Sequence, residues 1–100
     1  MKLWIDDVRI PPMGYCWVQS VNVAKALIED AEIKKVYGLI EVIDIDHDAG
    51  EFATDGGDYI KLLDWLEETG RNYPIHIHSM NPVGVANMRA IIQKNGWREV

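Results

Sequence analysis

The 100-residue sequence is poor in cysteine, in basic residues and in long apolar runs, and each shortage excludes a class of protein. Cys16 is the one cysteine, so no disulfide can form within the chain. A reducing compartment and a small buried thiol in a strand are the expectation. No stretch approaches the roughly 20 apolar residues of a membrane span, and the first residues lack the apolar core of a signal peptide. We therefore expect a cytoplasmic protein without a membrane partner.

Length and charge narrow the class further. A chain of 100 residues suits one domain, residues 1–100, because it is long enough for one core and too short for two. The 10 Lys and Arg residues against 16 Asp and Glu give a net charge of −6, which argues against a surface that follows the phosphates of duplex DNA. A small phosphorylated ligand or a single RNA end needs only a local site, so the composition is compatible with either.

Apolar periodicity and turn residues divide the chain into short strands and helices. Strands are expected at residues 2–5 and 15–18, along the apolar run from 39 to the acids at 46–48, at 75–79 and, as a last short edge strand, at 97–100. Helices are expected from Ser20 or Asn22 to about Lys35, over 58–69 and from Asn81 to about Lys94, with a mobile loop over 51–57. This alternation predicts right-handed crossovers and a mainly parallel sheet covered by helices, a three-layer α/β sandwich.

Polar clusters lie directly after three of the predicted strands. They are Asp6-Asp7 after the first strand, Asp46-His47-Asp48 after the central one, and His78-Ser79 with Asn81 after the next. The carboxyl ends of parallel strands meet at one edge of a sheet, where ligands of open α/β sheets bind. Asp44 and Asp46 share a side-chain parity, so we expect them to face one crevice.

Four carboxylates would repel each other at this edge unless a cation or bound protons neutralised them: Asp6, Asp7, Asp46 and Asp48. Oxygen ligands of this kind suit Mg²⁺, Mn²⁺ or Ca²⁺, and open positions for a phosphate favour Mg²⁺ or Mn²⁺. The alternative interpretation is structural. In it the acids cap loops and pair with Arg9 or His78.

Histidines accompany the acids at the same edge. His47 and His78, oriented by neighbouring carboxylates such as that of Asp48, have the chemistry of a general base and a general acid near neutral pH. The same histidines would alternatively bind a transition metal together with Asp46 or Asp48. His76 lies deeper in its strand, and we expect a structural role for it.

The segment that joins the predicted strand at 75–79 to the last helix has the character of an anion site. Free amides at the helix start, the Ser79 hydroxyl and the Asn81 amide would suit a phosphoryl oxygen, although Asn81 is also the expected helix cap. Arg9 would clamp the phosphate from the first loop. Trp4 is expected in the core.

Four segments resemble the cyclic-phosphate processing receiver-like family, distant relatives of the phospho-acceptor receiver domains of two-component signalling. They are LWIDDVRIPP, VIDIDHDAG, DGGDY and IHIHSMNPVGVANM, and they span nearly the whole chain. The resemblance implies a receiver/flavodoxin-like doubly wound sheet that has lost about one helix after the first strand, which agrees with the proline-rich loop there. It also implies an action on the cyclic phosphates of nucleotides or RNA ends.

The resemblance carries over to individual residues. Asp6 and Asp7 look like the acidic metal-binding pair of receivers, Asp46 like their phospho-acceptor and Ser79 like their hydroxyl residue. Receivers also hold the phosphoryl group with a lysine at the end of the last strand, and the lysine that follows Ser79 here is Lys94, inside a predicted helix. Signalling through an aspartyl phosphate is therefore the least favoured function. Four further residues look like additions of this family: His47, Asp48, His78 and Asn81.

The leading hypothesis is a metal-assisted phosphoesterase that opens a cyclic phosphate. Its roles divide as follows: Asp6, Asp7 and Asp46 bind the cation, His47 and His78 transfer protons with the help of Asp48, and Arg9, Ser79 and Asn81 bind the phosphate. The alternative is a non-catalytic receiver-like module that binds a cyclic nucleotide or a phosphorylated partner. An exposed edge strand near Trp97 would also allow a homodimer.

Overall fold

The computed structural model describes residues 1–35 and 39–100 of the chain. Its strands are β1 (Lys2–Ile5), β2 (Tyr15–Val18), β3 (Val42–Ile45) and β4 (Ile75–Ile77). Its helices are α1 (Val21–Lys34), α2 (Ile60–Glu68) and α3 (Pro82–Asn95), with a short 3₁₀ helix, η1 (Gly50–Thr54). Not one of the helices in these two ranges is both long enough and apolar enough to cross a membrane.

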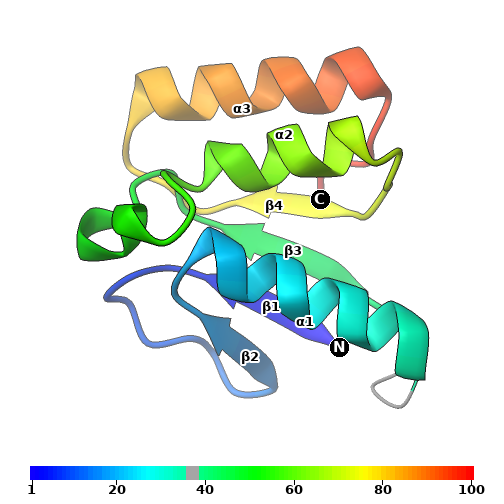
Figure 1. The fold of residues 1–100 in the computed structure, drawn as a ribbon. Coiled ribbons are helices and arrows are strands. Elements are labelled where there is room, and N and C mark those ends of the chain that lie inside the picture. Colours follow the sequence, from blue (N-terminus) through cyan, green and yellow to red (C-terminus); the bar gives the residue numbers. More distant parts are fainter. Residues whose placement is uncertain (36–38) are drawn as a thin grey trace.

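The strands form one parallel sheet in the order β2-β1-β3-β4 (Figure 1). β1 lies inside the sheet, where Leu3 pairs with Cys16 on one side and with Ile43 on the other. β3 continues the sheet to β4, with Ile43 opposite Ile75. This four-stranded parallel sheet with three helices is the α/β receiver-like arrangement that the sequence predicted.

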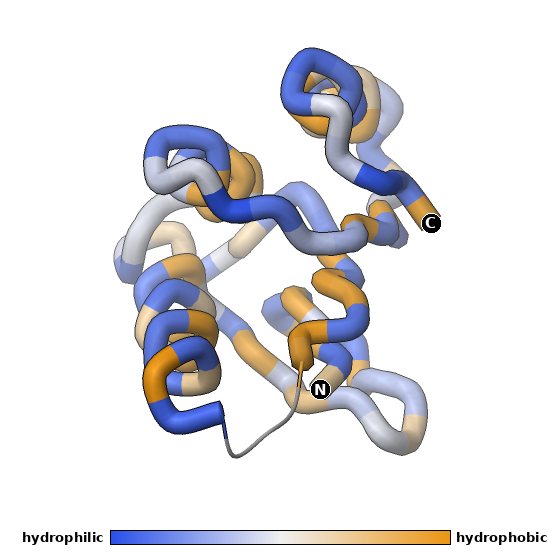
Figure 2. Tube along the Cα trace, turned by 90° about the vertical axis from the view of Figure 1, so that its right-hand side faces the viewer, coloured by the Kyte–Doolittle hydropathy of each residue, from blue (hydrophilic) through white to orange (hydrophobic). Residues whose placement is uncertain are grey.

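Two of the described helices, α1 and α2, cover one face of the sheet. Figure 1 shows them in front of the strands, with α3 beside α2 at the β4 edge of the sheet. Figure 2 shows apolar stretches alternating with polar ones along the helices, as expected of helices with one buried side. The strand side chains beneath the helices are fully buried: Leu3, Ile5, Ile43, Ile45 and Ile75. On the opposite face His76 is exposed and Trp17 is 41 % exposed. None of the described helices covers this opposite face.

The connection after β1 explains why no described helix covers the opposite face. Right-handed crossovers place their helix according to the direction in which the chain moves along the sheet. The crossovers from β2 to β3 and from β3 to β4 move in the same direction, so α1 and α2 lie on one side. The step from β1 to β2 moves the other way, but it is made by the loop 6–14, which holds Pro11 and Pro12 instead of a helix.

Element boundaries follow the predicted ones within two residues in the helices and less closely in the strands. The central strand begins at Val42, later than the predicted residue 39, and the predicted mobile loop at 51–57 includes most of η1. The predicted last strand at 97–100 is reduced to a single parallel bridge between Ile75 and Glu99. Of the two predicted alternatives for the cap of α1, Ser20 is the cap and accepts from the Val23 amide at 3.2 Å. The predicted cap Asn81 is confirmed, since it accepts from the Gly84 amide at 3.0 Å.

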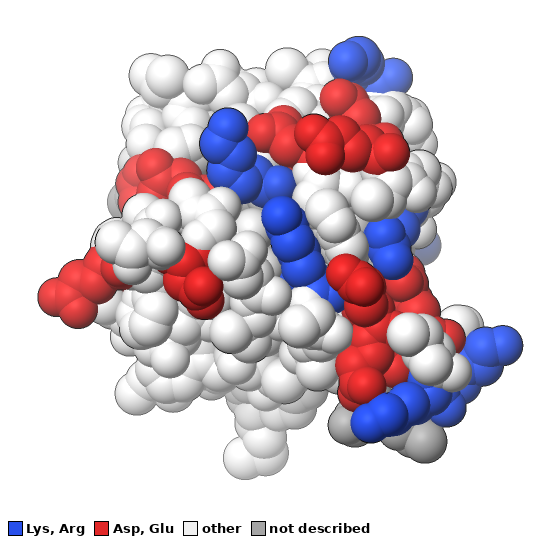
Figure 3. Space-filling model, viewed as in Figure 1, with Lys and Arg blue, Asp and Glu red and all other residues white. Residues whose placement is uncertain are grey.

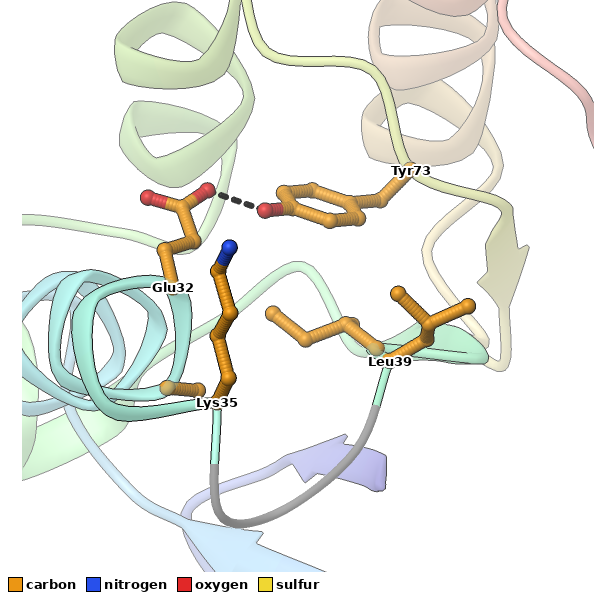
Figure 4. Close-up of a pocket in the computed structure, with 6 residues that line it drawn as sticks. Glu32, Lys35, Leu39 and Tyr73 are labelled. Carbon is orange, nitrogen blue, oxygen red and sulfur yellow. Dashed lines mark hydrogen bonds between the residues drawn. The ribbon is translucent and has the colours of Figure 1, made fainter.

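A hollow of about 420 Å³ lies at the amino ends of β3 and β4, at the opposite end of the sheet from the polar clusters. Figure 4 shows the Glu32 carboxylate and the Tyr73 ring on one side of it and Leu39 on another. Tyr73 donates a hydrogen bond to Glu32, and Arg71 donates to both oxygens of the same carboxylate, at 3.0 and 2.8 Å for the shorter contacts. These contacts tie α1 to the segment that leads into β4.

Candidate active site

Three carboxylates meet where β1 and β3 end. The hydrogen-bond ladder of the sheet continues one residue beyond the strands, because the Asp6 amide donates to Val18 and the Asp46 amide donates to Ile5, at 3.2 and 2.9 Å. Asp6 and Asp46 therefore leave the sheet at the same level, and Asp7 follows directly. One oxygen from each of Asp6, Asp7 and Asp46 lies within 4.8 Å of the others. Asp48, the fourth predicted acid, lies outside this cluster and is exposed.

Asp6 is fully buried, and both of its oxygens are engaged. Oδ1 accepts from the amides of Val8 and Arg9 at 3.0 and 2.9 Å, and Oδ2 accepts from His78 Nε2 at 2.9 Å. Burial by itself raises the pKa of Asp6, but the hydrogen bonds from Arg9, Val8 and His78 outweigh it and the net pKa lies below the ordinary value. Asp6 is thus held ionised.

Asp7 lies against the backbone of Gly50, in the loop after β3. A Cβ atom on Gly50 would come within 2.4 Å of Asp7 Oδ2, and Gly50 has a φ of +55°. Both facts require glycine at this position. Burial raises the pKa of Asp7, and the charges of Asp6 and Asp46 add to that rise. The Gln19 amide holds the backbone of Asp7 by donating to its carbonyl oxygen at 3.1 Å.

The donor set fits a small, hard cation. Three carboxylates offer oxygen ligands only, which suits Mg²⁺ or Mn²⁺ better than metals that prefer sulfur or nitrogen. Burial raises the pKa of Asp7, the neighbouring charges of Asp6 and Asp46 add to the rise, and a bound cation would offset this repulsion. Asp46 Oδ1 accepts from the His47 amide at 2.8 Å, so the turn itself orients this carboxylate.

His78 bridges two carboxylates on the face of the sheet that carries no helix. Its Nδ1 lies 2.5 Å from Asp44 Oδ1 and its Nε2 lies 2.9 Å from Asp6 Oδ2. The ring also stacks on Trp4, with centroids 3.9 Å apart and planes within 5°. Burial lowers the pKa of His78, but the hydrogen bonds to Asp44 and Asp6 outweigh it and raise the pKa above the ordinary value.

Two expectations change here. Asp44 and Asp46 were expected in one crevice, but β3 ends at Ile45 and Asp46 lies in the turn beyond it, so their parity no longer applies. Trp4 was expected in the core, but it lies half-buried on the helix-free face against His78. Sequence reasoning gave Asp44 no role in the site. Its position in the sequence was a signal that could have been used, because Asp44 is a carboxylate between two buried isoleucines.

His47 lies in the loop after β3, against the first turn of α3. Its Nδ1 is 2.8 Å from Asp48 Oδ1 and 3.5 Å from the Asn81 side-chain nitrogen. Gly84 faces the ring so closely that a Cβ atom there would lie 2.4 Å from His47 Cγ. The predicted orientation of His47 by Asp48 is thus present. Nδ1 is the engaged nitrogen, and among the described residues Nε2 has no hydrogen-bond partner.

The three predicted phosphate-binding residues border the same edge. Ser79 Oγ accepts from the Asn81 amide at 3.1 Å, which shapes the turn into α3. Arg9 is exposed, and its Nη1 donates to the His78 carbonyl oxygen at 2.9 Å, so it joins the first loop to the end of β4. The same Nη1 lies 4.0 Å from Asp6 Oδ2. His76, predicted as structural, is exposed and its Nδ1 lies 2.6 Å from the Val100 carbonyl oxygen.

Aromatic side chains support the first loop and α2. The Trp17 indole donates to the Asp6 carbonyl oxygen at 2.8 Å, and the Trp4 indole donates to the Arg9 carbonyl oxygen at 2.9 Å. Tyr59 is fully buried and donates to the Gln19 carbonyl oxygen at 2.7 Å. Sequence reasoning missed these supporting residues. For the two tryptophans a signal existed, because strand alternation places both on the helix-free face.

The helix-covered side differs in character from the acidic edge. Figure 3 shows acidic and basic side chains interspersed on it rather than gathered into one broad basic surface. The features that set this molecule apart therefore lie at the carboxyl ends of the strands.

Fold and site together define a receiver-like α/β domain with a carboxylate cluster and two histidines at the carboxyl edge of its sheet. The chain matches the model of the cyclic-phosphate processing receiver domain over residues 1–94 and belongs to this family. Comparisons with curated proteins and with solved structures gave no match. The resemblance drawn from the four sequence segments is thereby confirmed.

Proposed function

We propose that this domain binds a divalent cation, Mg²⁺ or Mn²⁺, at Asp6, Asp7 and Asp46 and hydrolyses a cyclic phosphate next to it. The observation that carries the proposal is the convergence of three carboxylates within 4.8 Å, beside a histidine with one unengaged ring nitrogen among the described residues. A bound cation would supply charge neutralisation for the phosphate and the developing oxyanion. The family of cyclic-phosphate processing receiver domains gives the substrate class.

His47 is the residue best placed to move a proton. Its Nδ1 is held by Asp48, so the ring presents Nε2 to a water molecule, as a general base requires. In hydrolysis this water adds to phosphorus and gives one proton to His47 Nε2, while one ester P–O bond breaks. Because both nitrogens of His78 are already engaged, we assign His78 to holding Asp6, and the leaving oxygen takes its proton from solvent.

Residues at the border of the site would orient the phosphate. Arg9 would pair with phosphoryl oxygens from the first loop, and the Ser79 hydroxyl and the Asn81 amide would meet the other side of the group. The amides at the start of α3 add a favourable dipole for an anion. Cyclic nucleotides and a cyclic-phosphate RNA end would both offer the required group.

A second candidate function is binding of the same ligand without hydrolysis. The full engagement of His78 leaves the site with one available imidazole, which favours a module that binds a cyclic phosphate, or a phosphorylated partner, without turnover. The two functions differ in what His47→Asn does. It abolishes turnover and spares binding in an enzyme, whereas it only weakens affinity in a sensor.

Phosphorus NMR tests the proposal on a panel of 2′,3′- and 3′,5′-cyclic nucleotides and a cyclic-phosphate RNA end, with Mg²⁺ or Mn²⁺ and with chelator. We expect metal-dependent loss of one cyclic-phosphate resonance that His47→Asn abolishes. His76→Asn is the matched control, because His76 is exposed and bonded to the chain end. Resonances that shift without conversion would identify the binding module, and a panel without any change would refute the ligand class.

A further inference from the structure

Asp44 is a buried acid on the helix-free face of the sheet. It lies in β3 between Ile43 and Ile45, it is 6 % exposed, and its contact in the direction of the edge is His78. Burying a carboxylate costs free energy unless a partner compensates its charge. The contact with the His78 ring is therefore what offsets the cost of burying Asp44.

His78 connects Asp44 to Asp6. The ring is held from three sides, by Asp44 at Nδ1, by Asp6 at Nε2 and by the stacked indole of Trp4. Its flat face cannot tilt while Trp4 lies 3.9 Å away, and its two edges are both bonded. The Nε2 donor is thereby aimed at one oxygen of Asp6.

Asp6 has little freedom left. A carboxylate has about four acceptor positions. The amides of Val8 and Arg9 take two on Oδ1, and His78 takes one on Oδ2. A single position on Oδ2 is left for a cation, and the carboxylate cannot rotate to offer a second oxygen without breaking a bond.

We propose that Asp44 is a positioning residue that acts through His78 to fix Asp6, and that this makes the carboxylate cluster prefer Mg²⁺ to Ca²⁺. The inference rests on the cation site of the proposed function. Mg²⁺ needs near-octahedral ligands at about 2.0–2.1 Å, whereas Ca²⁺ takes 6–8 ligands at about 2.3–2.6 Å and tolerates flexible, bidentate carboxylates. An Asp6 limited to one fixed oxygen suits the smaller ion.

The test is the ratio of two affinities rather than either affinity alone. Loss of a negative charge weakens both dications to a similar extent, so it leaves the ratio of Mg²⁺ to Ca²⁺ affinity unchanged. Loss of the fixed geometry of Asp6 weakens Mg²⁺ more than Ca²⁺. Competition of each ion against Mn²⁺, followed by electron paramagnetic resonance of the free Mn²⁺, gives the ratio without any substrate.

We expect Asp44→Asn to lower the Mg²⁺-to-Ca²⁺ ratio by about 10-fold, because changes behind metal ligands cost about 10–100-fold in metal affinity and the loss should fall mainly on Mg²⁺. Asp58→Asn is the matched control: it removes an exposed carboxylate from the same end of the molecule, whose described role is to accept from the Ala49 amide at 3.0 Å, and it should leave the ratio unchanged. His78→Gln should lower the ratio as Asp44→Asn does and serves if Asp44→Asn does not fold.

The outcomes separate the two proposals. A wild-type protein that binds none of the three ions refutes the cation site and with it the proposed function. A wild-type protein that binds Mn²⁺ normally, with the same ratio in Asp44→Asn or His78→Gln, overturns the positioning role alone. A ratio that falls equally in Asp58→Asn would show a general charge effect and would overturn it as well.

Discussion

Gly84, in the first turn of α3, lies directly against the imidazole ring of His47: a Cβ atom on this glycine would be 2.4 Å from His47 Cγ and 2.5 Å from Cδ2. The two residues are distant in sequence and come from the loop after β3 and from the helix after β4. The absence of a side chain at Gly84 is therefore a condition for the position of His47. The helical backbone at Gly84 does not by itself require glycine.

Gly84→Ala separates stability from activity. Alanine is favoured over glycine inside a helix by about 1 kcal/mol, but moving the His47 ring out of contact costs free energy, so we expect an unchanged or slightly lower free energy of unfolding. The added methyl group displaces the His47 ring, so hydrolysis should fall by about 100-fold. Urea unfolding and phosphorus NMR measure the two effects. Val83→Ala, at an exposed position in the same turn, should change neither by much, and full activity in Gly84→Ala would contradict the role of His47.

Gly50→Ala and Gly70→Ala form a matched pair. Both glycines are in the left-handed region, with φ of +55° and +69°, but a Cβ on Gly50 meets Asp7 whereas a Cβ on Gly70 meets nothing within 4 Å. We expect each variant to lose about 1–2 kcal/mol of stability. Only Gly50→Ala should also weaken Mn²⁺ binding, measured by calorimetry. Equal Mn²⁺ affinities in the two variants would remove Asp7 from the cation site.

Tyr59→Phe tests the support of Asp7 from behind. The buried Tyr59 hydroxyl donates to the Gln19 carbonyl, and the Gln19 side chain donates to the Asp7 carbonyl. Burial, with the charges of Asp7 and Asp6, raises the pKa of Tyr59, which keeps it a donor. Its removal leaves a buried carbonyl oxygen unpaired, and we expect a loss of about 1–2 kcal/mol in urea unfolding. Tyr15→Phe is the control, and an equal loss there would show that the bond to Gln19 contributes nothing special.

The pH dependence of stability should report on Glu32. The hydrogen bond from Arg71 lowers the pKa of the Glu32 carboxyl below 4.5, with burial opposing and the Tyr73 hydroxyl adding to the shift. A carboxyl whose pKa is lower in the folded than in the unfolded state stabilises the fold above the unfolded pKa, and this stabilisation is lost as the pH falls through the folded pKa.

We therefore expect wild type to exceed Glu32→Gln by about 1 kcal/mol at pH 7. The difference should shrink towards zero as the pH falls from the ordinary carboxyl pKa of 4.5 through the lower pKa of the folded state. Urea unfolding at a series of pH values measures it. Glu29→Gln, one turn earlier on α1 and exposed, should show a small difference at every pH. A constant difference between wild type and Glu32→Gln would mean that ionisation of Glu32 does not contribute.

Local signals predicted most of the fold. Ser20 and Asn81 cap their helices through contacts three residues along the chain, and Gly96 ends α3 with a φ of +66°. The sequence identified the two limits of α3 and restricted the cap of α1 to Ser20 or Asn22. The face of the sheet that each helix covers does not follow from local signals, because it depends on the direction of each crossover and thus on the strand order. The last strand was overestimated because an edge of three or four residues is stabilised by pairing and not by propensity.

The candidate site was likewise predictable from the sequence only in part. Asp6, Asp7 and Asp46 were predicted together because each follows a strand, and parallel strands bring such positions to one edge. The contact between Asp44 and His78 was not predictable, because it is a diagonal contact that depends on the register in which Asp44 pairs with His76. Parity placed Asp44 with Asp46. The end of β3 at Ile45 separated them.

The strand order has a consequence for how the protein comes into being. β1 lies inside the sheet, and its pairing with β3 joins Lys2 to Val42. The bond from His78 to Asp6 then spans 72 residues. During synthesis the acidic loop therefore leaves the ribosome long before the strands that complete its surroundings, and its charges are hydrated and apart until β4 arrives. The complete site at the carboxyl ends of the strands therefore forms only in the finished sheet, and a fragment that ends before β4 cannot form it.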